Sequence, residues 1–140
     1  MEAFVLDASV AFSWCFPGDP SEDTPYSRRV LAMLRTRDAV VPEIWPFEIA
    51  NSIFVSSSKR HRITEQQIRE FLERLKPLPI RIEPYSMWGN IGLESLARKL
   101  NLAAYDIAYV DLALRKNLPL ATLDDALKDA AKTEGIRVLS

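Results

Sequence analysis

The run Ala3-Phe4-Val5-Leu6-Asp7-Ala8-Ser9, near the start of the chain, is an apolar segment that ends in a carboxylate. Its short length and its apolar, β-branched character are typical of a strand. Four other segments share this character: Ala39–Val41, Ile80–Ile82, Leu118–Leu123 and Ile136–Leu139. With Ala3–Leu6 included, the sequence predicts a sheet of about five strands.

Apolar residues recur at helical spacing between these strands. Thr64, followed three residues later by Gln67, has the form of a capping box for a helix that ends near Leu75. The other helical segments are Arg28–Leu34, Trp45–Val55, Met87–Leu100, Ala104–Arg115 and Asp125–Glu134. Parallel neighbouring strands need crossover connections of about this length. We therefore predict an α/β fold with a largely parallel central sheet flanked by helices.

The composition is that of an ordinary soluble protein. The 140 residues are 48% hydrophobic and 26% charged, with a net charge of −1, and we expect one domain over residues 1–140. The longest mostly apolar stretch, Ala8–Phe16, is too short to span a bilayer. The first residues lack the basic leader of a signal peptide, so we expect a cytoplasmic protein without a membrane segment. Because the net charge is slightly negative, contact with nucleic acid must be local or mediated by metal ions.

Four acidic residues stand in apolar surroundings at predicted strand ends and helix starts. Ligands of α/β sheets bind beyond the carboxyl ends of the strands, and both Asp7 and Asp124 directly follow predicted strands. Glu48 and Asp106 lie near the starts of two predicted helices. A carboxylate beside a core costs free energy unless it is paired, hydrogen-bonded or bound to a cation. Because these motifs contain no Lys or Arg, we predict that the acids share Mg²⁺ or Mn²⁺, which prefer oxygen ligands.

Each acid also has a purely structural explanation. Asp106 suits a helix N-terminus as a cap or through the helix dipole. Asp7 could end a strand in an Asx turn, and Glu48 could be a first-turn helix acid. Asp124 and Asp125 both suit the start of the last helix, which leaves open which of the two faces the site. It is the coincidence of all four acids at such positions that favours a functional site.

Four motifs resemble those of PIN domains in order and spacing. They are Val5–Ala11, Pro46–Asn51, Leu102–Tyr109 and Leu118–Asp124, and together they make the resemblance cover the whole chain. The match looks closest to the VapC-type toxins of bacterial and archaeal toxin–antitoxin pairs. It implies a PIN-like fold, a metal-dependent endoribonuclease activity on an RNA substrate, and a VapB-like antitoxin as partner. A homodimer is also expected.

The resemblance also implies roles for individual residues. Asp7, Glu48 and Asp106 would be the core acids, and Asp124 the fourth and less essential one. Ser9 and Thr122 would be supporting hydroxyls. Such a site supports hydrolysis of a phosphodiester by a water molecule that one or two cations activate, so no side-chain nucleophile is required.

Other families that place aspartates at strand ends fit the sequence less well. A receiver-type signalling domain would have an adjacent acidic pair near the first strand and a lysine after a late strand, but here Asp7 precedes Ala8 and the late strand precedes Asp124-Asp125. A haloacid-dehalogenase-type phosphatase would have an aspartate where Ser9 stands. The alternative interpretation is a signalling or interaction module without nuclease activity. The presence of all four acids argues against it.

Two further features could contact partners. The basic run Lys59-Arg60-His61-Arg62 lies between two predicted helices and is either a solvated turn or a phosphate contact. The aromatic residues are numerous for a small core; we expect most of them inside and a few at an antitoxin groove or a homodimer contact. They are Phe12, Trp14, Phe16, Trp45, Phe47, Phe54 and Trp88.

Overall fold

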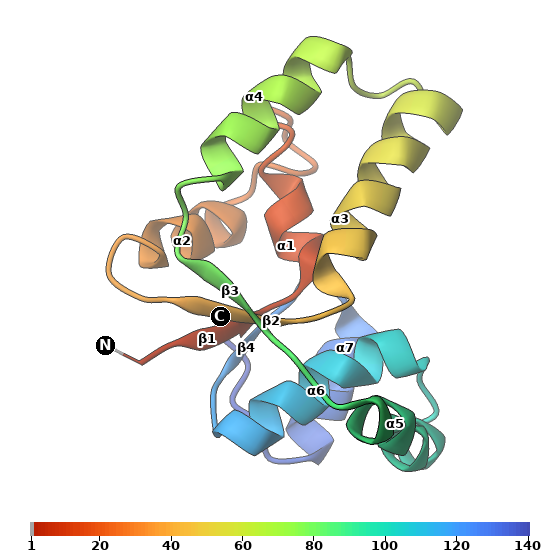
Figure 1. Ribbon diagram of the computed structural model, residues 1–140. Helices are drawn as coiled ribbons and strands as arrows, with labels where there is room; N and C mark the ends of the chain where they lie inside the picture. Colours follow the sequence, from red (N-terminus) through yellow and green to blue (C-terminus); the bar gives the residue numbers. More distant parts are fainter. Residues whose placement is uncertain (1) are drawn as a thin grey trace.

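A parallel sheet lies at the centre of the fold (Figure 1). The computed structural model describes residues 2–140 of the chain. The strand order of the sheet is β3-β2-β1-β4. Val5 of the central strand pairs with Val40 on one side and with Leu120 on the other. The strands are β1 (Phe4–Leu6), β2 (Ala39–Pro42), β3 (Ile80–Glu83) and β4 (Leu120–Ala121). The predicted α/β class and parallel sheet are therefore confirmed.

The sheet has four strands rather than the expected five. The segment Ile136–Leu139 makes only an isolated parallel bridge, between Val138 and Leu120. The reason is the length of β4, which ends at Ala121 because the chain then turns toward the next helix. Too few β4 residues are therefore left for a fifth strand to pair with.

Helices cover both faces of the sheet. In Figure 1 the first four lie above it and the last three lie below it. The upper group is α1 (Ala8–Ser13), α2 (Pro25–Met33), α3 (Trp45–Phe54) and α4 (Glu65–Leu75), with a π-helical turn η1 (Val55–Lys59) that extends α3. The lower group is α5 (Met87–Leu100), α6 (Ala104–Lys116) and α7 (Asp125–Thr133).

Local sequence signals set several of the helix ends. The capping box predicted at Thr64 and Gln67 is present with both of its hydrogen bonds. Gly135, just after α7, has a φ of +76°, a conformation that favours glycine. Two helix starts differ from the predictions: α1 was not expected, and α2 begins three residues earlier, at Pro25, because Thr24 caps it and proline suits the first helical position.

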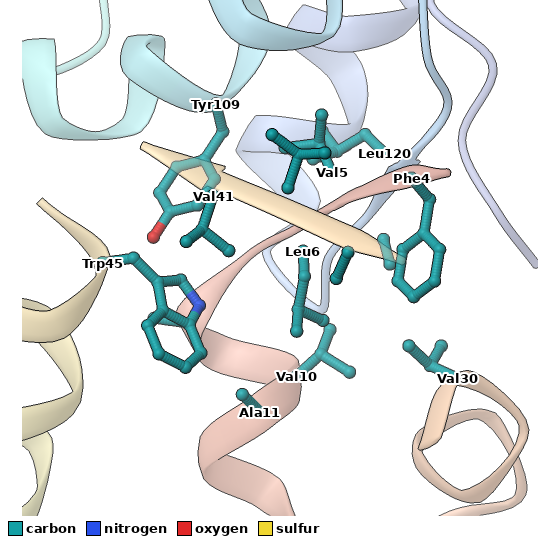
Figure 2. Packing of buried hydrophobic residues seen from close by; sticks show 14 of the residues in the cluster. Phe4, Val5, Leu6, Val10, Ala11, Val30, Val41, Trp45, Tyr109 and Leu120 are labelled. Carbon is teal, nitrogen blue, oxygen red and sulfur yellow. The ribbon is translucent and has the colours of Figure 1, made fainter. Parts of the chain in front are cut away.

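Buried side chains from both faces of the sheet form the core (Figure 2). β1 is buried over its whole length, and Val10 of α1 and Val30 of α2 pack on one side of it. Tyr109 of α6 enters the core fully buried, and its ring lies beside Val41 of β2. The core thus packs around the end of β1, which α1 continues and α6 contacts. Of the aromatic residues singled out above, Phe12, Trp14, Phe16 and Trp45 belong to the core, whereas Phe47, Phe54 and Trp88 are exposed.

Candidate active site

Asp7 follows the last residue of β1 and occupies the N-cap position of α1. It is the only buried charged residue among residues 2–140, with 7% of its surface exposed. Its Oδ2 atom accepts hydrogen bonds of 2.7 Å from the hydroxyls of Ser9 and Thr122. Burial raises the pKa of Asp7, the two hydroxyl bonds lower it, and the nearby charge of Asp124 raises it further. The carboxylate is thus held in place, and no Lys, Arg or His among residues 2–140 pairs with it.

The two hydroxyl groups also fix the loop that follows β4. Thr122 Oγ1 accepts a 3.0 Å hydrogen bond from the backbone N–H of Asp124, and Ser9 Oγ accepts one of 3.2 Å from Leu123 N–H. Asp7 and Asp124 therefore lie at the same edge of the sheet, linked through Thr122. This agrees with the supporting role that the PIN resemblance implies for Ser9 and Thr122.

Thr122→Val keeps the shape of a fully buried side chain but removes its hydroxyl. The change deprives Asp7 of one donor and leaves the Asp124 N–H without its acceptor. We expect it to lower the free energy of unfolding by about 1–3 kcal/mol, the usual cost of unsatisfied buried polar groups. Urea unfolding monitored by circular dichroism measures this. As a control, Thr133→Val removes a hydroxyl that bonds only to its own helix, and it should cost no more than about 0.5 kcal/mol. Equal losses in the two variants would contradict the role given to Thr122.

Glu48 lies in the first turn of α3, where its Oε1 atom accepts a hydrogen bond from the hydroxyl of Tyr109. The pKa of Glu48 is raised to about 7, first by burial and then by the charges of Asp7 and Asp106, while the bond from Tyr109 opposes the shift. Burial, followed by the charge of Glu48, raises the pKa of Tyr109 above its ordinary value. Tyr109 consequently remains a hydrogen-bond donor to Glu48 at neutral pH.

No role for Tyr109 was predicted from the sequence. A signal was available, because Tyr109 stands three residues after Asp106 on the same helix, a spacing that places two side chains on one face. Its partner, Glu48, is however 61 positions away in the sequence. Only the packing of α6 against β2, the strand that precedes α3, brings the two side chains together.

Asp106 lies in the first turn of α6 but does not cap this helix. The N-cap of α6 is Ala103, and no side-chain hydrogen bond caps this helix. Burial, followed by the charges of Asp124 and Asp7, raises the pKa of Asp106. The hydrogen-bonding explanation that competed with a functional role for Asp106 is therefore not supported.

Asp124 is an N-cap, in agreement with one of the structural explanations. Its Oδ1 atom accepts hydrogen bonds from the backbone N–H groups of Ala126 and Leu127, at 2.9 and 3.2 Å. The neighbouring Asp125 has a side chain that is 95% exposed and lies 3.6 Å from Lys128. Since the charge of Asp124, and not that of Asp125, raises the pKa values of Asp7 and Asp106, it is Asp124 that lies near the other acids.

The four carboxylates share two properties. Within residues 2–140, none of them forms an ion pair with Lys, Arg or His. Each also has at least one oxygen without a hydroxyl or capping donor. The bonds of Asp7, Glu48 and Asp124 each end on one oxygen, and the Asp106 carboxylate accepts no such bond within residues 2–140. This is an all-oxygen set with uncompensated negative charge, the kind of donor set that suits Mg²⁺ or Mn²⁺. Over the same residues, no three His, Cys, Asp or Glu side chains are close enough to hold one ion directly.

The basic segment Lys59–Arg62 lies at the other end of the α3–η1 helix from Glu48 (Figure 1). Arg62 forms a 3.2 Å ion pair with Glu22, and its guanidinium lies 4.6 Å from the centre of the Phe16 ring. The side chain of Arg62 therefore ties the segment to the loop before α2. Its contacts account for Arg62 within the protein and do not place it beside the four acids.

Comparison with known proteins identifies the family. A sequence model of the PIN domain matches residues 4–133. The chain belongs to the PIN domain family. PIN domains are generally nucleases, and the four carboxylates lie in the four motifs that suggested this family from the sequence.

Two crystal structures show the same fold as this PIN domain. PAE2754 from Pyrobaculum aerophilum superposes with a TM-score of 0.69 at 16% sequence identity, covering 94% of this chain and 81% of that chain. FitAcB from Neisseria gonorrhoeae superposes with a TM-score of 0.60 at 18% identity, covering 98% of this chain and 96% of that chain. No curated protein matches this PIN domain by sequence. Among residues 2–140, no helix combines the length and the apolar character needed to cross a membrane.

Proposed function

We propose that this PIN domain is a metal-dependent endoribonuclease and the toxin of a VapBC-type toxin–antitoxin pair. One observation carries the nuclease proposal. Four carboxylates lie close enough for the charges of some to help raise the pKa values of others, and none has a basic partner within residues 2–140. Such a cluster repels itself, which costs free energy in the absence of a bound cation. A structural or purely interacting module gains nothing from this arrangement, whereas a phosphodiesterase uses it to bind metal.

Asp7, Glu48, Asp106 and Asp124 would hold the metal, Mg²⁺ or Mn²⁺, in part through water molecules. When bound, the metal supplies charge that offsets the phosphate and makes a water molecule a better nucleophile. The remaining work falls to the protein. Ser9 and Thr122 orient Asp7 through its Oδ2 atom, Tyr109 orients Glu48 through its Oε1 atom, and the helix α7 orients Asp124. Asp7, Glu48 and Asp124 are thus positioned before a substrate arrives, which reduces the cost of reorganisation during the reaction.

The toxin assignment and the partners are further parts of the proposal. They rest on the resemblance of the four motifs to VapC-type toxins, and we propose a VapB-like antitoxin as the partner. Exposed apolar side chains on α5, namely Met87, Trp88 and Ile91, provide surface suited to a protein contact such as a homodimer.

Incubation of the purified protein with total RNA tests the nuclease proposal. We expect cleavage with Mg²⁺ or Mn²⁺ at millimolar concentration and none after EDTA is added, because no side chain of the site can replace the charge of the metal. RNA fragments resolved on a denaturing gel are the measurement. Asp125→Asn, which changes an exposed acid of the same helix start, is the matched control and should cleave like the wild type. Full cleavage in EDTA, or none with either metal, would contradict the proposal.

A further inference from the structure

A mostly apolar pocket lies next to the candidate active site. Its volume is about 290 Å³. Its lining comes from the end of β2, the loop to α3 and the start of α3, and from the loop before α5, α5 itself and the start of α6. Leu93 and Ala108 are buried beneath it in a second hydrophobic cluster with Ile107. The pocket is therefore backed by packed side chains rather than by a flexible loop.

Two exposed aromatic residues line this pocket, and both are adjacent in sequence to an acid of the site. Phe47 precedes Glu48 and is 73% exposed, and Tyr105 precedes Asp106 and is 63% exposed. On α6, Asp106 and Tyr109 share one helix face, while Tyr105 and Ala108 share the neighbouring face. On α3, Phe47 and Glu48 are likewise consecutive residues, so their side chains also lie on neighbouring faces of the helix. The pocket and the carboxylates therefore lie side by side on the same two helix starts.

The polar groups of the pocket match the edge of a nucleobase better than a phosphate. No Lys or Arg lines it, so it offers nothing to the charge of the RNA backbone. Glu43 Oε1 accepts hydrogen bonds from the Tyr85 N–H at 2.7 Å and from the Asn90 amide at 3.5 Å. Oε2 of Glu43 has no hydrogen-bond partner among residues 2–140. A carboxylate oxygen accepts hydrogen bonds from exocyclic amino groups, and an amide can donate or accept at a base edge.

We infer that this pocket binds one base of the RNA, stacked on Phe47 and Tyr105, next to the phosphate held at the four acids. The inference rests on the proposed nuclease function and specifies which part of the RNA substrate the protein recognises. Single-stranded RNA is recognised by stacking of unpaired bases on aromatic side chains and by hydrogen bonds to base edges. Because the polar acceptor is a carboxylate, the pocket prefers bases that carry an amino group, such as adenine or cytosine, to uracil.

Binding of short RNA homopolymers tests the inference without requiring cleavage. The Asp106→Asn protein serves as the background, since it is expected to bind RNA without cutting it, and fluorescence anisotropy gives the Kd. We expect oligo(A) and oligo(C) to bind more tightly than oligo(U). Phe47→Ala and Tyr105→Ala should each raise the Kd for oligo(A) by roughly 5- to 150-fold, the range that corresponds to the loss of one base–aromatic stack. Tyr105→Phe retains the ring and should bind like the background protein.

Phe54→Ala is the matched control, because Phe54 is an exposed aromatic residue of α3, 52% exposed, that does not line the pocket. It should leave the Kd unchanged. Equal binding of oligo(A) by the background protein and by both pocket variants would overturn the inference, and so would an equal loss in all three variants. A change of oligomeric state in Phe47→Ala with unchanged RNA binding would assign the pocket to a protein contact instead. If wild-type protein cuts no RNA while the pocket variants still weaken oligo(A) binding, the nuclease proposal fails and the base pocket stands.

Discussion

Asp106→Asn is expected to reduce RNA cleavage by about 100-fold or more, since the loss of a group that merely supports a metal ligand already costs 10- to 100-fold. Asparagine has nearly the same shape but lacks the negative charge that binds a hard cation. Asp106 makes no capping bond to α6, so the helix itself should be unaffected. Cleavage of one RNA substrate at fixed Mg²⁺ or Mn²⁺, compared with the wild type, is the measurement.

The stability of the same variant separates a site acid from a structural one. Without metal, Asp106→Asn removes a charge that the neighbouring charges of Asp124 and Asp7 destabilise. The free energy of unfolding should therefore be unchanged or slightly higher, and circular dichroism should show the wild-type fold. A folded Asp106→Asn protein that cleaves RNA at the wild-type rate would remove Asp106 from the site. A clear loss of stability would show instead that Asp106 has a structural role.

Cleavage should depend steeply on pH because of Glu48, whose pKa is raised to about 7. If the ionised form is needed, the rate should fall by about tenfold per pH unit well below pH 7, as for any single titrating group. Tyr109→Phe removes the hydrogen bond that lowers this pKa, so the midpoint should move to higher pH. Rates measured from pH 5 to 9 on one substrate provide the test. A flat profile, or a midpoint that stays in place in Tyr109→Phe, would contradict this assignment.

Stability without metal should show the opposite dependence on pH. Because the pKa of Glu48 is higher in the folded state than its ordinary value of 4.5, the folded protein binds more protons between pH 4.5 and about 7. The contribution of Glu48 to stability is therefore fully present below that window and is lost as the pH rises through about 7. Mn²⁺, which binds the ionised carboxylates, should stabilise the protein more at pH 8 than at pH 5.5.

Urea unfolding of the wild type and of Glu48→Gln, each with and without Mn²⁺, measures the contribution of Glu48 to the free energy of unfolding. Glu48→Gln should be less sensitive to pH than the wild type over the window, because glutamine does not titrate, and it keeps an oxygen that can accept the bond from Tyr109. Its stabilisation by Mn²⁺ should also be smaller. An identical pH dependence in the two proteins would show that Glu48 does not have the raised pKa.

The sequence by itself determined the α/β class, the parallel sheet and the family, because these follow from local patterns. The run Phe4-Val5-Leu6 and the capping box at Thr64 specify a strand and a helix start within a few residues. The same local patterns predicted that Asp7 and Asp124 follow strands, which places both at one sheet edge. They failed for Ile136–Leu139, because whether an apolar segment becomes a strand depends on the length of its neighbour, and β4 is too short.

Only the tertiary structure decided how the acids are held and what surrounds them. The sequence could not tell whether Asp106 caps α6, and the absence of a side-chain capping bond shows that it does not. Nor could it show that Tyr109 donates to Glu48 or that Phe47 and Tyr105 line one pocket, since these residues come from separate helices. The physical reason is that pKa values, hydrogen-bond partners and pockets depend on which surfaces meet across long sequence separations, whereas strand and helix patterns depend on near neighbours.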